Sequence, residues 1–421
     1  MKFTSTNQRS TADLKQAVTH SLAPDGGLYI PTEIPQLSAD FFQNISKLSF
    51  AEIAFQVAKN FLQNSVDETI LRKICEETVN FACPLIQISE NTHVLELFHG
   101  PTLAFKDFGA RFMSRLVQHF ATNKITVLVA TSGDTGSAVA HGFLGIQNTE
   151  VILLYPKGKV SPLQEKQLTT MGQNITALEI AGTFDDCQTM VKQAFADPKL
   201  NEKYNLTSAN SINIARLIPQ TFYYFFAYQQ LQKPAIYSVP SGNFGNITAG
   251  LLAAKMGLPT TQFIAAVNAN DTFPRFQKTG HYEPKPSIQT ISNAMDIGNP
   301  SNFARLQALH FTEKIWSKSF TDAETNQTMH NWADRYTLDP HGAVGFLGLE
   351  SFRQQHPEHQ NTPAVILETA HPAKFREVVE QAIGHPIEIP EALAQYANRE
   401  KQAIELKNDY QNFKTFLLKR V

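Results

Sequence analysis

Lys106 is the residue whose type and surroundings most directly indicate chemistry. It lies in the segment 98–108, FHGPTLAFKDF, a mostly apolar stretch in which a solvated lysine is not expected. Burial and the positive end of the helix expected after it both disfavour the charged ammonium form. A lysine whose pKa is lowered in this way is a nucleophile, suited to forming a Schiff base with an aldehyde. The alternative is a lysine whose stem packs on phenylalanine rings while its amine reaches water.

Two loops rich in small residues are suited to binding anions. The first is TSGDTGS at 131–137 and the second is PSGNFGN at 240–246. Each follows an apolar run and precedes an expected helix, whose free N–H groups and dipole favour a negatively charged ligand. The alternative for the first loop is a capped turn, in which Ser132 or Asp134 satisfies those N–H groups.

The second loop is expected to cradle a single phosphate. Its two glycines allow the backbone to approach phosphate oxygens closely. The loop is neither a Gly-x-Gly-x-x-Gly fingerprint nor a lysine-containing P-loop, which disfavours a dinucleotide or a nucleoside triphosphate. The alternative is a glycine-rich connection without a ligand. The expected phosphate-binding residues are Gly242, Asn243, Phe244, Gly245 and Asn246.

A third loop, 368–375, follows another apolar run, and its Thr369 is placed to offer a hydroxyl to the same cleft. A threonine at a strand end is also a common helix cap. Together, a reactive lysine, a single-phosphate cradle and a second anion loop predict a pyridoxal-phosphate site. The lysine would hold the cofactor aldehyde, the 240–246 loop its phosphate, and the 131–137 loop the carboxylate of an amino-acid substrate.

The elements expected to position these loops follow a βα pattern. From about residue 94 onward, short apolar runs alternate with amphipathic segments, which is typical of parallel strands covered on both faces. Ligands of such sheets bind beyond the carboxyl ends of the strands, where the three loops lie. The expected strands include 125–130, 151–154, 235–239, 262–267 and 364–367. The expected helices are 49–63, 67–81 and 107–120, and Lys106 lies just before the last of them. Residues 1–85 as a whole are expected to be mixed loop and helix, and residues 391–421 polar helix.

Composition excludes several classes of protein. The 421 residues carry 36 Lys and Arg against 38 Asp and Glu, a net charge of -2 without a basic run, which disfavours a nucleic-acid partner. The three cysteines form no Cys-x-x-Cys pair, so we expect neither a disulfide framework nor a zinc site. A reducing compartment is therefore expected. No apolar segment is long enough for a signal sequence or a membrane span, so a cytoplasmic location is expected. The histidines show no metal-ligand spacing, and no metal is expected.

Several segments together carry a family resemblance over nearly the whole chain: 22–29, 99–107, 132–136, 210–216, 242–246, 296–303 and 369–372. On these motifs the chain resembles the threonine synthases, within the tryptophan-synthase-β-like enzymes of pyridoxal-phosphate fold type II. The resemblance implies a two-lobed α/β fold with open, largely parallel sheets and an N-terminal extension. The implied divisions are 1–90 for the extension, 91–220 for the lobe with the Schiff-base lysine and carboxylate loop, 221–390 for the lobe with the phosphate loop, and 391–421 for a C-terminal helical segment.

The resemblance also implies a role for each candidate residue. Lys106 would carry the cofactor, residues 242–246 would hold its phosphate, and Thr369 would face its pyridine nitrogen. Asp134 would lie beside the cofactor, at a position where many relatives in the wider fold carry Asn. A carboxylate there would repel the cofactor phenolate unless the carboxylate is protonated or turned away. The role of Asp134 is therefore open. The residues implied at the substrate are Thr102, Ser132, Gly133 and Thr135, with Ser211 and Arg216 for the substrate phosphate.

The implied reaction converts O-phospho-L-homoserine and water to L-threonine and phosphate, in a monomer or homodimer. A related phospholyase that releases a 2-oxo acid shares these motifs and is the nearest alternative. A non-catalytic cofactor-binding scaffold has no physical need for a desolvated Lys106. A nucleotide-binding dehydrogenase would need the glycine fingerprint that this chain lacks.

Overall fold

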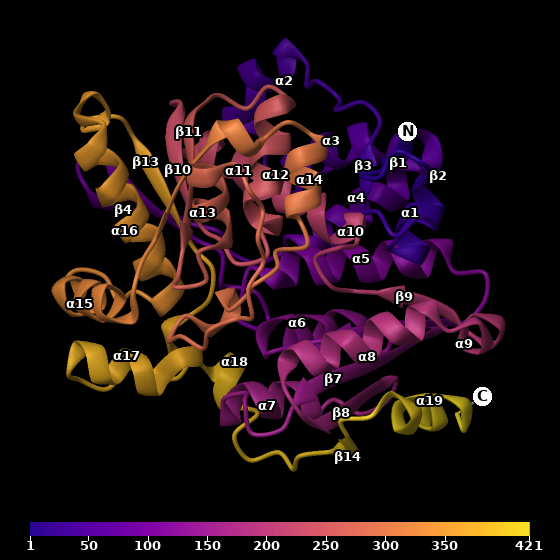
Figure 1. The fold of residues 1–421 in the computed structure, drawn as a ribbon. Helices are drawn as coiled ribbons and strands as arrows, with labels where there is room; N and C mark the ends of the chain where they lie inside the picture. The colour runs from indigo at the N-terminus through magenta and orange to yellow at the C-terminus, as the bar shows by residue number, and fades with distance from the viewer. Residues whose placement is uncertain (421) are drawn as a thin grey trace.

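The computed structural model describes residues 1–420 and builds most of them around two open sheets (Figure 1). The larger sheet has the strand order β12-β11-β10-β13-β5-β4, and the smaller has the order β14-β8-β7-β6-β9. All neighbouring strands are parallel except β4 and β5. This confirms the expected two-lobed α/β class with largely parallel sheets.

The bounds of the strands show which of the apolar runs in the sequence form strands. The larger sheet consists of β4 (Leu85–Ser89), β5 (Thr92–Glu96), β10 (Ala235–Pro240), β11 (Thr260–Val267), β12 (Ile315–Ser319) and β13 (Ala364–Glu368). The smaller consists of β6 (Ile125–Ala130), β7 (Thr149–Pro156), β8 (Ile175–Ala181), β9 (Asn205–Ser208) and β14 (Ala403–Lys407). The five expected strands are β6, β7, β10, β11 and β13. Every residue of β6, β10 and β13 is buried, as continuous apolar runs require.

The expected helices are also present. They are α3 (Phe50–Leu62), α4 (Glu68–Thr78) and α5 (Lys106–Phe120), and the anion loops lead into α6 (Asp134–Phe143) and α12 (Gly245–Lys255). Lys106 is the first residue of α5, whereas the sequence placed it just before a helix that begins at residue 107. No helix within residues 1–420 is long and apolar enough to cross a bilayer.

The remaining helices cover the sheets and close the two ends of the chain. They are α1 (Leu14–His20), α2 (Ala39–Asn44), α7 (Pro162–Thr169), α8 (Phe184–Ala196), α9 (Pro198–Lys203), α10 (Ile214–Leu217), α11 (Gln220–Leu231), α13 (Thr272–Thr279), α14 (Phe303–Ala308), α15 (Asp322–Trp332), α16 (Pro340–Gln355), α17 (Arg376–Ile383), α18 (Glu391–Ala394) and α19 (Tyr410–Leu418). A short 3₁₀ helix, η6 (Pro372–Phe375), follows β13.

Both ends of the chain differ from the sequence prediction. The first 31 residues contain a three-stranded antiparallel sheet of β1 (Lys2–Ser5), β2 (Thr11–Asp13) and β3 (Tyr29–Pro31), where mixed loop and helix was expected. The stretch expected to be polar helix contains β14 between α18 and α19. These strands are too short to show a period of two, and β14 is a half-exposed edge strand. The division of the chain at 91–220 and 221–390 stays a prediction.

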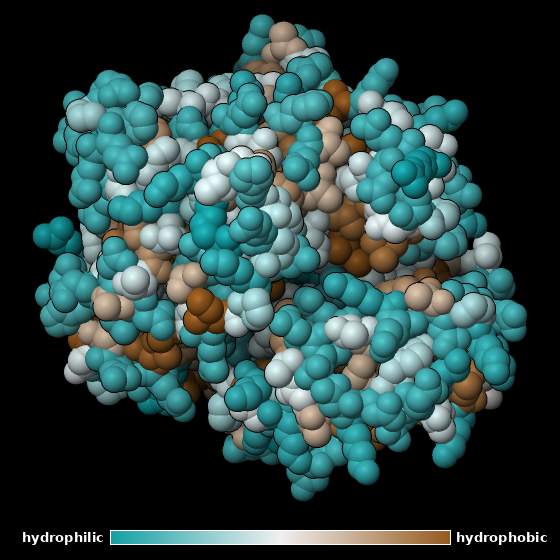
Figure 2. Space-filling view, in the orientation of Figure 1, coloured by the Kyte–Doolittle hydropathy of each residue, from teal (hydrophilic) through white to brown (hydrophobic). Residues whose placement is uncertain are grey.

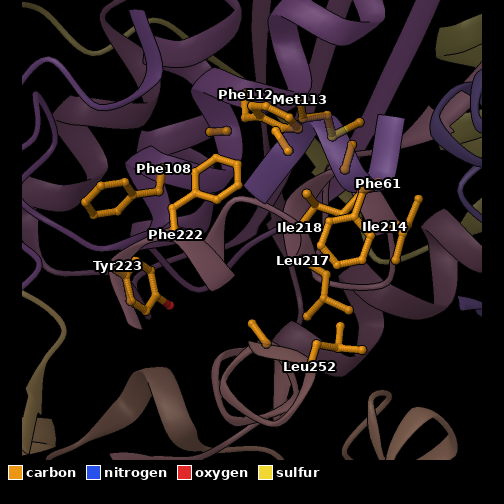
Figure 3. Close-up of a cluster of buried hydrophobic side chains, with 14 of the residues drawn as sticks. Phe61, Phe108, Phe112, Met113, Ile214, Leu217, Ile218, Phe222, Tyr223 and Leu252 are labelled. Atoms are coloured by element: carbon orange, nitrogen blue, oxygen red, sulfur yellow. The ribbon is translucent and has the colours of Figure 1, made fainter. Parts of the chain in front are cut away.

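A buried apolar cluster joins the helices that carry the predicted site (Figure 3). It forms where α3, α5, α10, α11 and α12 meet. Because these helices share one close-packed core, their N-terminal ends are fixed relative to one another. The side chains labelled in Figure 3 are Phe61, Phe108, Phe112, Met113, Ile214, Leu217, Ile218, Phe222, Tyr223 and Leu252.

His141, on the helix α6 that packs against α5, gives this region a dependence on pH. Burial, together with the nearby charges of Arg111 and Arg115, lowers the pKa of His141 from 6.5 to about 4. The unfolded chain therefore takes up a proton that the folded chain excludes, so stability is complete above pH 6.5 and is lost as the pH falls towards 4. We expect this group to reduce the free energy of unfolding by about 3 kcal/mol between pH 7 and pH 4.

Thermal unfolding of the wild type and of His141→Gln across this pH range measures the effect. The variant is expected to show a shallower loss of stability in acid. An equal pH dependence in both proteins would contradict the assignment to His141.

Candidate active site

The three predicted loops open onto one cavity of about 420 Å³ at the carboxyl ends of β6, β10 and β13. In Figure 2 the surface is hollowed between the two halves of the molecule, and apolar residues are visible in the hollow. Thr102 and Gly133 are not among the residues that line the cavity. The predicted residues that do line it are Lys106, Ser132, Asp134, Thr135, Ser211, Arg216, Gly242, Asn243, Phe244, Gly245, Asn246 and Thr369.

Lys106 lies in the kind of environment that the sequence indicated. Its side chain is 16% exposed, and its Nζ lies 5.1 Å from the centre of the Phe105 ring. Burial lowers the pKa of Lys106; the Asp134 carboxylate, 3.6 Å from Nζ, opposes this effect, and the charges of Lys374 and Arg216 add to it. A lysine in this state loses its proton more readily than a surface lysine, as nucleophilic chemistry requires.

Lys374 is the residue of the site that the sequence did not reveal. Its fully buried ammonium lies 2.9 Å from Asp134 Oδ1 and donates to the carbonyl oxygen of Thr102 at 2.7 Å. Gln164 Nε2 donates to the same Asp134 oxygen at 2.8 Å. Burial alone would raise the pKa of Asp134, but the charges of Lys374 and Lys106 hold it well below its usual range. The pairing with Lys374 therefore favours the ionised form of Asp134, and its role towards the cofactor stays a prediction.

The start of α12 has the features of a phosphate cradle. Phe244, the residue before the helix, has a left-handed φ of 59°, and within the described chain no side chain caps this helix. Tyr223 and Tyr224 donate to Asn246 Oδ1 at 2.7 and 2.8 Å, which fixes the amide so that its Nδ2 is the free end. That buried nitrogen has no hydrogen-bond partner among residues 1–420. Free backbone N–H groups and an unpaired amide donor fit the phosphate of pyridoxal phosphate.

Asn243 holds the cradle in place through its neighbours. Its Nδ2 donates to Ser211 Oγ at 2.5 Å, and its Oδ1 accepts the N–H of Ser301. Asn302 Nδ2 in turn donates to the carbonyl oxygen of Asn243 at 3.0 Å. The predicted cofactor loop and the predicted substrate residue Ser211 are therefore parts of one hydrogen-bonded network.

The start of α6 is capped from an unexpected position. The Thr131 hydroxyl accepts the N–H groups of Gly133 and Gly136 at 3.0 and 2.8 Å, a role that the sequence offered to Ser132 or Asp134. Gly133 has its N–H committed in this way, and Ser132 and Thr135 are left to line the cavity.

Arg216 brings a buried positive charge to the cavity. It lies on α10, and one of its terminal nitrogens donates to the carbonyl oxygen of Ala209. Burial lowers the pKa of Arg216 to about 10. Its Nε is buried beside Gly109 of α5 and has no partner in the described part of the chain. A guanidinium suits phosphate geometry, and contact between Arg216 and a substrate phosphate stays a prediction.

Thr102 is placed one layer behind the cavity. Its hydroxyl donates to Asp107 Oδ1 at 2.7 Å and its N–H to Oδ2 at 2.8 Å, and its side chain is fully buried. It approaches the site through its carbonyl oxygen, which accepts from Lys374. A direct contact between Thr102 and substrate stays a prediction.

The backbone at Gly242, in the phosphate cradle, leaves no room for a larger side chain. A Cβ added to Gly242 would lie 2.5 Å from Met295 Cα, so an alanine there must displace backbone. We expect Gly242→Ala to lower the melting temperature by at least about 4 °C and to weaken cofactor retention. The matched control is Gly245→Ala, whose Cβ would lie at an ordinary 3.5 Å from Ser211 and Asn302. Equal melting temperatures for the two variants, measured by thermal unfolding, would contradict the close approach.

Comparisons with known proteins agree with this site. The family model described as pyridoxal-phosphate dependent enzyme matches residues 87–369, and models for the threonine synthase N terminus and C-terminal region match 2–79 and 342–417. The threonine synthase of Haemophilus influenzae is 43% identical over 96% of both chains, and that of Escherichia coli is 45% identical over 91% of both.

Solved structures show the same similarity. The crystal structure of threonine synthase from Escherichia coli superposes with a TM-score of 0.94 at 40% identity and covers 100% of both chains. The pyridoxal-phosphate-bound threonine synthase from Brucella melitensis gives a TM-score of 0.91 at 34% identity, over 99% of this chain and 98% of that one. Matches of family models, sequences and structures extend over both the site and the flanking regions. The chain therefore belongs to the threonine synthase family of pyridoxal-phosphate-dependent enzymes.

Proposed function

We propose that this chain converts O-phospho-L-homoserine and water to L-threonine and inorganic phosphate. The observation that carries the proposal is one cavity with donors for two separate phosphates beside a buried lysine. The first set of donors is the start of α12 with Asn246, and the second is Arg216 with Ser211. A cofactor phosphate and a substrate phosphate would occupy these two sets.

The residues of the cavity would hold the cofactor as follows. Residues 242–246 bind its phosphate, Thr369 offers a hydroxyl to its ring nitrogen, and Asp134 lies beside Lys106 as part of an ion pair. A hydroxyl at the ring nitrogen makes the ring a milder electron sink than an Asp would. When bound, pyridoxal phosphate supplies that electron sink for bonds broken at the carbons near the substrate amine.

The chain's own groups would then bind substrate and move protons. Ser132 and Thr135 receive the substrate carboxylate, with Gly133, whose N–H is held by Thr131, and Thr102 behind them. Arg216 and Ser211 hold the phosphate that leaves from the γ carbon. Lys106 Nζ removes the proton from the α carbon and acts as a base again at the β carbon, where water adds. Phosphate and threonine account for all the atoms of substrate and water.

We also propose a cytoplasmic location, supported by three buried free thiols, Cys75, Cys83 and Cys187, which suit a reducing compartment. The proposed assembly is a monomer or homodimer. Within one subunit the proposed lobes are 91–220 and 221–390, between the 1–90 extension and the 391–421 segment.

The test is to add O-phospho-L-homoserine to the cofactor-loaded protein and to identify the product by chromatography, with Lys106→Ala as the control. Threonine formed in equal amount to phosphate, and absent in the variant, would support the proposal. Formation of 2-oxobutyrate would establish the phospholyase alternative instead. No turnover would overturn the substrate assignment.

A further inference from the structure

Three buried charged groups from three elements meet beside the cavity. Lys106 comes from the start of α5, Asp134 from the start of α6, and Lys374 from η6 after β13. The side chains of Asp134 and Lys374 are 3% and 0% exposed. The charges of Asp134 and Lys374, so far from water, must be paired in a defined arrangement, since each unpaired charge would cost several kcal/mol, and Lys106 lies beside them at the cavity.

The two oxygens of Asp134 have different partners. Oδ1 accepts from Lys374 at 2.9 Å and from Gln164 at 2.8 Å, whereas Oδ2 lies 3.6 Å from Lys106 Nζ. One oxygen is therefore saturated and fixed, and the other is directed at the lysine that performs the chemistry. A carboxylate that was free to rotate would not keep this distinction.

Lys374 is itself held on several sides. Its ammonium donates to the carbonyl oxygen of Thr102 at 2.7 Å and to Gln167 Oε1 at 3.3 Å, in addition to its contact with Asp134. Thr102 is bonded to Asp107, the residue next to Lys106. Lys374 therefore links the segment that carries Lys106 to the helix that carries Asp134.

We propose that Lys374 is a positioning residue: it holds Asp134 through Oδ1, directs Oδ2 at Lys106, and with Asp134 sets how readily the Lys106 nitrogen takes and releases a proton. This inference rests on the proposed function, in which Lys106 moves protons at the α and β carbons. In this proposal Asp134 does not donate a hydrogen bond to the cofactor. Its negative charge acts on Lys106 instead.

The proposal predicts opposite effects for the two partners. The Asp134 carboxylate favours a proton on Lys106, while Lys374 and Arg216 disfavour it. The other groups around Lys374 are the neutral Gln167 and the ionisable Asp107 and His371, and the other group on Asp134 is Gln164. A merely structural role would instead make both substitutions weaken the protein in the same way.

The test uses the full-length, cofactor-loaded protein without substrate. Its visible absorption depends on whether the Lys106 nitrogen is protonated, so the midpoint of a pH titration reports that proton. We expect Lys374→Met to raise the midpoint by about one pH unit and Asp134→Asn to lower it by about one. The double variant is expected to return towards the wild-type midpoint. Lys166→Met, which removes a half-buried lysine of neighbouring α7 whose ammonium donates to the carbonyl oxygen of Ala397, is the matched control and should leave the midpoint unchanged.

Midpoints that move in the same direction, or that stay within about 0.2 pH units of wild type, would overturn the proposal. If the single variant Lys374→Met fails to retain cofactor, the effect of removing Lys374 is measured in the Asp134→Asn background. The double variant should then have a higher midpoint than Asp134→Asn alone. Because substrate is absent, failure of these shifts is distinct from failure of turnover with O-phospho-L-homoserine.

Discussion

Lys106→Ala is expected to reduce kcat for threonine formation by at least about 10⁴-fold, because it removes both the cofactor-bearing amine and the base. Lys374 cannot replace it, since its ammonium is already committed to Asp134 and to the Thr102 carbonyl. Release of inorganic phosphate under saturating substrate measures the loss.

The matched control is Lys157→Ala, which removes a surface lysine that pairs with Glu405 at 2.8 Å. Exposed ion pairs contribute about 1 kcal/mol or less, and this residue lies outside the cavity lining, so its kcat should stay within about two-fold of wild type. Activity above about 1% in Lys106→Ala would refute the role given to the lysine.

Arg305→Met is expected to cause the largest loss of stability, about 4 kcal/mol. Arg305 is 0% exposed, and burial lowers its pKa to about 9. Its guanidinium donates to the carbonyl oxygens of Tyr29, Ser211 and Ile212 and to Asn302 Oδ1. Methionine would leave all four acceptors without their donors, and Tyr29 and Asn302 are buried residues. These bonds join β3 to the loop that carries Ser211, and KM for the phosphorylated substrate should therefore rise as well.

Denaturant unfolding and steady-state kinetics measure the two effects together. Arg305→Lys keeps the charge but loses the planar fork, so we expect an intermediate loss. Arg72→Met removes an exposed arginine that pairs with Glu52, and it should cost less than about 1 kcal/mol. A loss of similar size in Arg305→Met and Arg72→Met would show that the buried bonds contribute little.

Local signals in the sequence were sufficient for the parts of the site that lie on continuous segments. Lys106 stood out by its apolar neighbours, and residues 242–246 by two glycines after an apolar run. Both line the cavity as expected. The strands that were recognised are those buried on both faces, because only these are continuous in apolar residues.

Pairing between distant segments could not be predicted in the same way. Lys374 lies in the loop 368–375, where nothing in the local sequence names Asp134 as its partner. Likewise, nothing in the local sequence indicates that the hydroxyls of the buried Tyr223 and Tyr224 orient Asn246. The N-terminal strands and β14 were missed because they are short, and β14 also pairs with a strand far away in the sequence, β8.

The pairing of β14 with β8 has a consequence for the order of synthesis. β8 ends at Ala181 and β14 begins at Ala403, so the ribosome makes every strand of the larger sheet before the smaller sheet can be completed. Throughout that interval the backbone donors and acceptors on one side of β8 have no strand to pair with, and such an edge invites pairing with another chain. The nascent protein therefore passes through a stage that is vulnerable to aggregation, and the arrival of residues 403–407 ends it.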